Sequence, residues 1–108
     1  MSKGTELIAA ERERQVTEEG YSAEDDADHS TELAVAGAAY AASAAYSTLG
    51  PVGPDNVLSF EDVEWPWDKR FWKPTGDPVR DLTKAGALIA AAIDSLTQEA
   101  ADAAEKSN

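Results

Sequence analysis

The sequence predicts a small all-α domain of three helices, with a long loop rich in tryptophan and proline before the last helix. Apolar residues recur every three or four positions in two alanine-rich segments, which is the spacing of a helix face. Residues that favour helix starts and helix ends flank these segments. Four of the five prolines fall within residues 50–76, where helical periodicity is lacking. A chain of 108 residues corresponds to a single domain, 1–108.

The first two helices are expected at about residues 5–19 and 31–48. Thr5 can cap the first helix, and Gly20 stands where a left-handed residue ends a helix. The second helix consists mainly of alanine, whose small side chain lets neighbouring helices approach closely. Gly50-Pro51 is expected to end it.

The third helix is expected at residues 77–98, because Asp77 followed by Pro78 is a strong helix start. Its apolar stripe is the clearest in the chain. The stripe consists of Leu82, Ala85, Ile89, Ala92, Ile93 and Leu96. The tail, 99–108, is expected to fray. The loop at 50–76 suggests a function, because structureless connections beyond about 15 residues are uncommon.

The composition predicts that this domain pairs with another copy. Of the apolar residues, 21 are alanine, and Leu, Ile, Val and Phe together number only 18. Nine basic and 21 acidic residues give a net charge of −12, and repulsion of that size opposes a small compact monomer. A helical protein with so few large side chains completes its core in a homodimer or a larger homo-oligomer.

Several classes of protein are unlike this sequence. The chain has no cysteine, which excludes disulfide scaffolds, zinc–thiolate sites and thiol nucleophiles. Apolar runs are too short to span a bilayer, and the first residues lack the apolar region of a secretion signal. The acidity argues against general binding to the backbone of DNA or RNA. We therefore expect a cytoplasmic protein that contacts neither membranes nor nucleic-acid backbones.

Basic and aromatic residues gather in one region of this acidic chain. Residues 69–84 carry five of the nine basic side chains and only two acidic ones, which makes the segment locally positive. Five of the eight aromatic residues lie between 60 and 72. Aromatic rings stack on nucleobases with about 1–3 kcal/mol per base, and guanidinium groups bind phosphates through two hydrogen bonds. The cluster indicates a ligand that carries both phosphate and a flat ring.

Two ordinary explanations compete with this interpretation. The three tryptophans, Trp65, Trp67 and Trp72, can instead fill the core beneath the long loop. Arg80 and Lys84, four residues apart on one helix face, can instead pair with the many carboxylates of the chain, as most surface cations do.

A second group is acidic and lies between residues 18 and 32. Carboxylates on adjacent helices can hold Mg²⁺, which needs one or two of them together with phosphate oxygens. The candidate ligands are Glu18, Glu19, Asp25, Asp28 and Glu32. Such a site would suit a MazG-like nucleoside triphosphate pyrophosphohydrolase, in which a metal-bound water is the nucleophile. Most acidic runs are solvated faces, and the sequence lacks the two clean acidic helix motifs of such enzymes.

The order of several motifs resembles a family of short uncharacterised proteins encoded by bacteriophages. The resemblance covers nearly the whole chain. It rests on Arg14-Gln15-x-x-x-Glu19-Gly20-Tyr21, Asp25-Asp26, Glu32-Leu33-Ala34, Tyr40-Ala41, Trp65-Pro66-Trp67-Asp68, Trp72-Lys73-Pro74 and Arg80-Asp81-Leu82-x-Lys84-Ala85-Gly86-Ala87-Leu88-Ile89. The chain departs from the family at Tyr21, where Trp is usual, and at Glu24, where His commonly precedes the two Asp residues. The second departure weakens a metal site built on that His.

The resemblance implies a protein that acts inside a bacterial host cell, where small phage proteins often counter host defence. Several such families are sponges that trap nucleotide signals of host immunity, and this step is an analogy. The sequence thus predicts a nucleotide-binding homo-oligomer that sequesters a cyclic or linear nucleotide without cleaving it, and without a cofactor. The candidate ligand-binding residues are Trp65, Trp67, Trp72, Tyr21, Arg70, Lys73, Arg80, Lys84, Asp25, Asp26 and Asp81.

Two alternatives stay open at this point. One is the Mg²⁺-dependent pyrophosphohydrolase described above. The other is an acidic inhibitor that imitates nucleic acid and binds a host protein, in which case the tryptophans are core and the net charge of −12 is the working surface.

Overall fold

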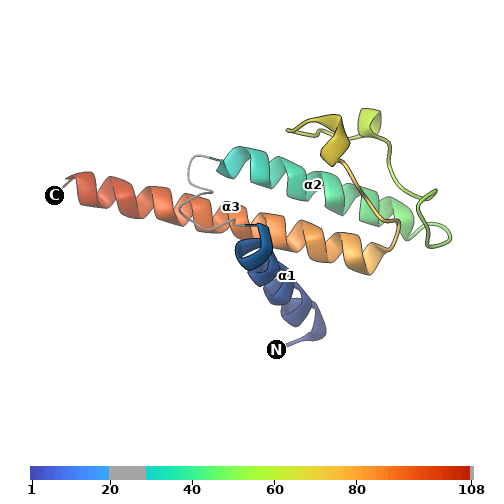
Figure 1. The fold of residues 1–108 in the computed structure, drawn as a ribbon, viewed down its shortest axis with the longest axis horizontal. Helices are drawn as coiled ribbons and strands as arrows, with labels where there is room; N and C mark the ends of the chain where they lie inside the picture. The colour runs from blue at the N-terminus through green and yellow to red at the C-terminus, as the bar shows by residue number, and fades with distance from the viewer. Residues whose placement is uncertain (20–28, 108) are drawn as a thin grey trace.

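The computed structural model describes residues 1–19 and 29–107, and within these ranges it contains three α-helices and no strand. The helices are α1 (Lys3–Glu19), α2 (Ser30–Ser47) and α3 (Pro78–Ser107). Figure 1 shows α2 and α3 side by side and antiparallel, with α1 crossing α3 at a steep angle. The predicted all-α class is confirmed. None of the helices in the described ranges is long and apolar enough to cross a membrane.

The starts of α1 and α3 have visible chemical causes. α1 begins two residues before the expected 5–19, because Ser2 rather than Thr5 caps it: the Ser2 Oγ accepts a hydrogen bond from the Thr5 amide at 3.2 Å. α3 begins at Pro78, where the sequence predicts it. The Asp77 carboxylate accepts a hydrogen bond from the Val79 amide at 3.0 Å, which satisfies one of the free donors of the first turn.

α3 continues to Ser107 and so includes most of the tail that was expected to fray. Four alanines between residues 100 and 104 explain this, because alanine has the highest helix propensity. Across this segment, the Gln98 side-chain amide donates a hydrogen bond to the Asp102 carboxylate at 3.0 Å. The last turns of this 30-residue helix project beyond the start of α2 (Figure 1).

Small side chains bring α2 and α3 close together. The buried cluster consists of Leu33, Ala36 and Tyr40 from α2 and Ala85, Leu88, Ala91 and Ala92 from α3. At Gly37, an added Cβ would lie only 2.8 Å from the Ile89 side chain, so the two helices contact each other closely there. Only the alanines of the predicted α3 stripe enter this core. Its four large residues, Leu82, Ile89, Ile93 and Leu96, stay 43–55% exposed.

The connection between α2 and α3 lies over α2 and contains two short 3₁₀ helices, η1 (Phe60–Asp62) and η2 (Lys69–Phe71). Two buried serines of α2 attach it. The Ser43 Oγ accepts a hydrogen bond from the Leu58 amide at 3.1 Å, and the Ser47 Oγ donates to the Asn56 carbonyl. The Asn56 side-chain amide returns a hydrogen bond to the Ser47 carbonyl at 2.9 Å. These bonds hold a long loop in one place without a large apolar core.

The end of the loop is fixed to the first turn of α3 by Asp81, whose side chain is buried. Its carboxylate accepts hydrogen bonds from the Thr75 amide at 3.0 Å, the Thr75 hydroxyl at 2.9 Å and the Gly76 amide at 3.1 Å. Gly76 has a φ of +83°, and a Cβ there would overlap the carbonyl of Gly53. Glycine is therefore required at this turn.

Candidate functional site

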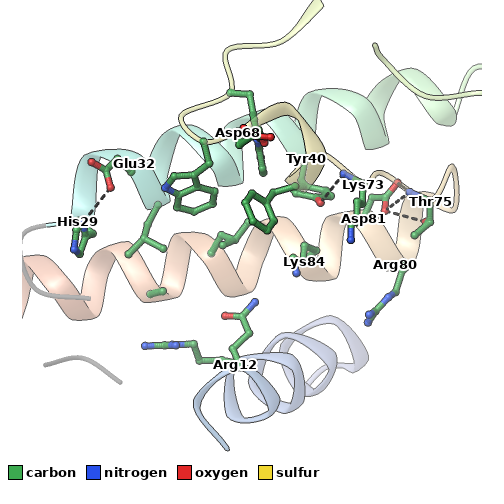
Figure 2. Close-up of a pocket in the computed structure, with 17 residues that line it drawn as sticks. Arg12, His29, Glu32, Tyr40, Asp68, Lys73, Thr75, Arg80, Asp81 and Lys84 are labelled. Carbon is green, nitrogen blue, oxygen red and sulfur yellow. Dashed lines mark hydrogen bonds and ion pairs between the residues drawn. The ribbon is translucent and has the colours of Figure 1, made fainter. Parts of the chain in front are cut away.

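A pocket of about 980 Å³ opens where the three helices and the loop meet. Ligand pockets usually measure about 300–1,000 Å³, so this one has room for a nucleotide. Figure 2 shows His29 and Glu32 at one end, Lys73 and Arg80 at the other, and Lys84 between them. The pocket therefore combines polar ends with the aromatic wall contributed by the loop.

Trp65 and Trp67 form that aromatic wall. Both line the pocket, and their ring centroids lie 5.4 Å apart with the planes at 89°. The Trp65 indole N–H donates to the Asp68 carbonyl at 3.1 Å, which fixes the orientation of the ring. The Trp67 indole N–H has no hydrogen-bond partner among the residues that the structure describes. It can therefore donate to a bound ligand.

Trp72 has a different environment and does not line the pocket. Like Trp65 and Trp67, it packs against the core. Its ring centroid lies 4.9 Å from that of Tyr40, and its indole N–H donates to the Leu58 carbonyl at 3.0 Å. Tyr40 is 4% exposed and accepts a hydrogen bond from the Lys73 amide at 3.3 Å. Burial raises the pKa of Tyr40, so its hydroxyl stays protonated. Tyr40 itself lines the pocket, and Trp72 packs against Tyr40 and Trp65 without lining it.

The candidate cations divide into three environments. Lys73 and Lys84 line the pocket and form no ion pair with any residue in 1–19 or 29–107. The Lys84 Nζ lies 6.0 Å from the centroid of the Tyr40 ring. Arg80 also lines the pocket, but its Nη1 donates to the Glu11 carboxylate at 3.2 Å. Arg70 does not line the pocket, and its guanidinium lies 4.8 Å from the centroid of the Phe71 ring.

Gln15 of α1 is a pocket residue that the sequence interpretation missed. Its side chain is 2% exposed and lines the pocket, yet it makes no hydrogen bond to any described residue. Every described side-chain polar atom that is fully sealed from solvent has a hydrogen-bond partner. The Gln15 amide therefore faces the pocket, where it offers one acceptor and two donors. Its position seven residues after Ile8, on the apolar face of α1, was the available signal.

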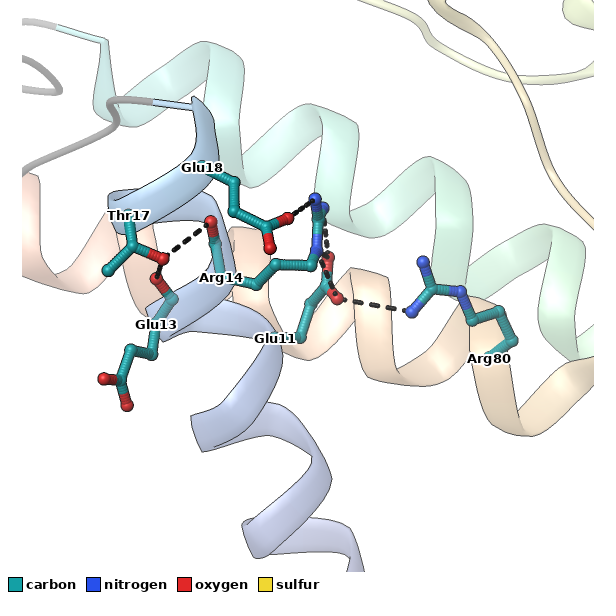
Figure 3. Close-up of polar contacts among 6 residues, drawn as sticks. All are labelled: Glu11, Glu13, Arg14, Thr17, Glu18 and Arg80. Carbon is teal, nitrogen blue, oxygen red and sulfur yellow. Dashed lines mark hydrogen bonds and ion pairs between the residues drawn. The ribbon is translucent and has the colours of Figure 1, made fainter.

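Arg80 reaches α1 through Glu11, a carboxylate that is 5% exposed. Figure 3 shows Glu11 between Arg14 and Arg80, with Glu13 pointing away from them. The Arg14 guanidinium donates to Glu11 at 2.7 Å and 3.1 Å, and Arg80 donates at 3.2 Å. The hydrogen bonds from Arg14 lower the pKa of Glu11 below its ordinary value near 4.5, against the effect of burial. The positive charges of Arg14, Arg80 and Lys84 lower it further.

Glu11 is expected to make the stability of the fold depend on pH. Because its pKa is lower in the folded state, it stabilises the fold above pH 4.5, and this contribution is lost as the pH falls through the folded pKa. Glu11→Gln should lower the free energy of unfolding by roughly 1–3 kcal/mol at neutral pH, because it removes charge-assisted hydrogen bonds. The difference from wild type should shrink below pH 4.5 in urea denaturation.

Glu13→Gln is the matched control, because Glu13 is exposed on the same helix. Its difference from wild type should stay small and independent of pH. A Glu11→Gln difference that persists unchanged at pH 3 would contradict the role given to this carboxylate.

The acidic candidates are only partly described. Tyr21, Asp25, Asp26, Asp28 and the side chain of Glu19 lie outside the described residues, so their predicted roles are untested. Glu18 pairs with Arg14 at 3.4 Å, and Glu32 pairs with His29 at 3.0 Å at one end of the pocket. Among the described side chains, no three potential metal ligands lie together.

Comparisons with protein-family models, with curated proteins and with solved structures found no match to this chain. The class that the fold and the site define is a small all-α domain with an open pocket lined by aromatic and basic side chains.

Proposed function

We propose that this protein binds a nucleotide in the pocket and sequesters it without cleaving it. The observation that carries the proposal is that Lys73 and Lys84, which form no ion pair with a described residue, line the same pocket as the Trp65 and Trp67 rings. Ammonium groups in an otherwise acidic molecule attract phosphate, and indole rings stack on bases.

The distribution of polar groups supports one orientation of the ligand. Lys73 and Arg80 lie at one end of the pocket, which suits a phosphate there (Figure 2). The indole N–H of Trp67 and the side-chain amide of Gln15 have no described partner and can hydrogen-bond to the edge of a base. The amide suits this role because it presents a donor and an acceptor side by side. Asp81 is occupied by Thr75 and Gly76, so its part is to hold the loop.

The resemblance to small phage proteins supplies the biological class of the ligand. We propose a nucleotide signal of a bacterial host, either cyclic or linear, and a protein that acts by lowering the free concentration of that signal. Such an activity requires tight, stoichiometric binding and an intact ligand after release.

Isothermal titration against a panel of cyclic and linear nucleotides tests the proposal. One member should bind, and it should be recovered unchanged by chromatography after the protein is denatured. Lys84→Ala and Lys73→Ala should each weaken binding about 10- to 100-fold, because a hydrogen bond to a charged group is worth about 1.5–3 kcal/mol. Gln15→Met, of similar shape but without the amide, should weaken binding about tenfold without lowering stability.

Arg70→Ala is the matched control, because Arg70 is a nearby loop cation that does not line the pocket. It should bind as tightly as wild type. Absence of binding by every nucleotide, or equal affinity of Lys84→Ala and wild type, would overturn the proposal. Release of pyrophosphate from a nucleoside triphosphate with Mg²⁺ would instead favour the pyrophosphohydrolase.

A further inference from the structure

α3 carries a row of large apolar side chains that the monomer leaves in solvent. Leu82, Ile89, Ile93 and Leu96 are 48%, 43%, 55% and 54% exposed. With Gly86 between the first two, they are spaced by four and three residues, the repeat by which one helix packs along another. We call these four residues the α3 stripe. They contribute little to the core, although large aliphatic residues are scarce in this chain.

The α3 stripe borders the contacts that α3 makes with the other two helices, and Ile89 takes part in one of them. On one side, Ile89 lies against Gly37 of α2, where an added Cβ would be 2.8 Å away. On the other side, Ile8 of α1 lies against Gly86, where an added Cβ would be 2.5 Å away. The two flanking helices approach α3 closely because glycine stands at both contacts. The four stripe residues nevertheless stay about half exposed.

The part of α2 beside the stripe is lined by small residues. Ala34 and Ala41 stand three residues before and four residues after Gly37 and therefore share its side of the helix, and Ala45 follows one turn later. Ala34 and Ala45 are exposed. A ridge of large side chains on α3 thus adjoins a shallow row of alanines on α2, and a two-fold rotation places each ridge over the alanines of the other copy.

Charge favours a second copy over other occupants of this face. From Leu82 to Ala100, the positions on the same side of α3 as the stripe carry no charge, in a chain whose net charge is −12. Two such chains repel each other over most of their surfaces, so an uncharged face is where they can approach. A basic or acidic partner would find no opposite charge here, whereas an identical face matches it.

We propose that the α3 stripe and the adjoining alanines of α2 form the interface of a two-fold symmetric homodimer. α3 has 30 residues and α2 has 18, which corresponds to helices about 45 Å and 27 Å long and about 10 Å wide. The α3 stripe covers only 15 residues of α3, from Leu82 to Leu96, and the alanines cover 12 residues of α2, from Ala34 to Ala45. These segments are about 22 Å and 18 Å long, so their combined face measures roughly 400 Å², about half of the 800 Å² that each partner contributes to a standard interface, which corresponds to a weak dimer. The pocket residues Lys84, Leu88 and Ala91 lie on a different side of α3, so the dimer leaves the pocket open.

Sedimentation equilibrium of the full chain tests the interface. Wild type should have about twice the 11.5 kDa mass of one chain. Ile93→Asp and Leu96→Asp should each weaken dimerisation at least 100-fold, because the two-fold axis brings two buried charges into one interface. Leu49→Asp is the control, since Leu49 is 83% exposed, is not part of the stripe, and should leave the dimer intact.

Circular dichroism of the same samples separates loss of the dimer from loss of the fold, and both Asp variants should keep the helical content of wild type. A wild-type chain that stays monomeric up to about 1 mM would leave the stripe to another kind of partner and would overturn the proposal. Dimers of equal affinity in wild type, Ile93→Asp and Leu96→Asp would overturn it too. Neither result depends on nucleotide binding.

Discussion

Replacing Tyr40 with alanine is expected to lower the free energy of unfolding by about 3–5 kcal/mol, the usual effect of removing a buried aromatic ring. Tyr40 is 4% exposed and is the largest residue of the α2–α3 core. Its ring centroid lies 4.9 Å from that of Trp72 and 5.7 Å from that of Trp65. Its hydroxyl accepts a hydrogen bond from the Lys73 amide. One truncation would thus open a cavity beneath the aromatic wall and release the loop at Lys73.

Urea denaturation followed by tryptophan fluorescence measures this effect, because both neighbours of the ring are tryptophans. Tyr46→Ala is the control on the same helix: Tyr46 is 44% exposed, and its loss should cost less than about 1 kcal/mol. Tyr40→Phe keeps the ring and removes only the acceptor for Lys73, so its cost should lie between the two. Equal stability of Tyr40→Ala and Tyr46→Ala would show that the aromatic cluster does not anchor the loop.

Removing the carboxylate of Asp81 is expected to cost about 3–5 kcal/mol. The side chain is 1% exposed and accepts hydrogen bonds from the Thr75 amide, the Thr75 hydroxyl and the Gly76 amide. Asp81→Ala leaves these donors without their partner at the base of the loop, and the buried Gly76 amide alone costs about 1–3 kcal/mol when it is left unpaired. Because the loop supplies the aromatic wall, nucleotide binding should weaken together with stability.

Asp77→Ala is the matched control, since Asp77 is an exposed carboxylate four residues away that caps α3 through the Val79 amide. Loss of this cap should cost about 1 kcal/mol. Asp81→Asn keeps an acceptor oxygen and should recover part of the lost stability in the same urea titration. If Asp81→Ala proved no less stable than Asp77→Ala, the carboxylate would not be what holds the loop to α3.

Sequence signals predicted those helix boundaries that depend on neighbouring residues in the chain. Asp77-Pro78 marked the start of α3 because a cap and a preset φ act within one turn. They did not predict that α3 continues to Ser107, although the alanines between residues 100 and 104 have high helix propensity. The cap of α1 is Ser2 and not Thr5. Both are hydroxyl residues that can cap a helix, so the sequence alone does not distinguish between them.

The sequence predicted the chemistry of the candidate site, but only some of the residues that line it. Clustering of cations and aromatic rings along the chain indicated the loop and the start of α3, and Trp65, Trp67, Lys73 and Lys84 line the pocket. All three tryptophans pack against the core, and only Trp65 and Trp67 also line the pocket. The sequence does not reveal which of them reach the pocket, because an indole suits both places. Gln15 was missed because it lies 45 residues before Phe60, the first residue of the cluster in the sequence.

By itself, the sequence determined the helical class, the start of α3, and a concentration of positive charge and aromatic rings in an acidic chain, since these follow from composition and neighbouring residues. Tertiary structure alone decided which rings face a cavity, which cations find a carboxylate, and which side of α3 stays in solvent. The physical reason is the small residues at the helix contacts. Ala36 and Gly37 let α2 approach α3 along a row of alanines, and this approach turns the large residues of the α3 stripe away from the core.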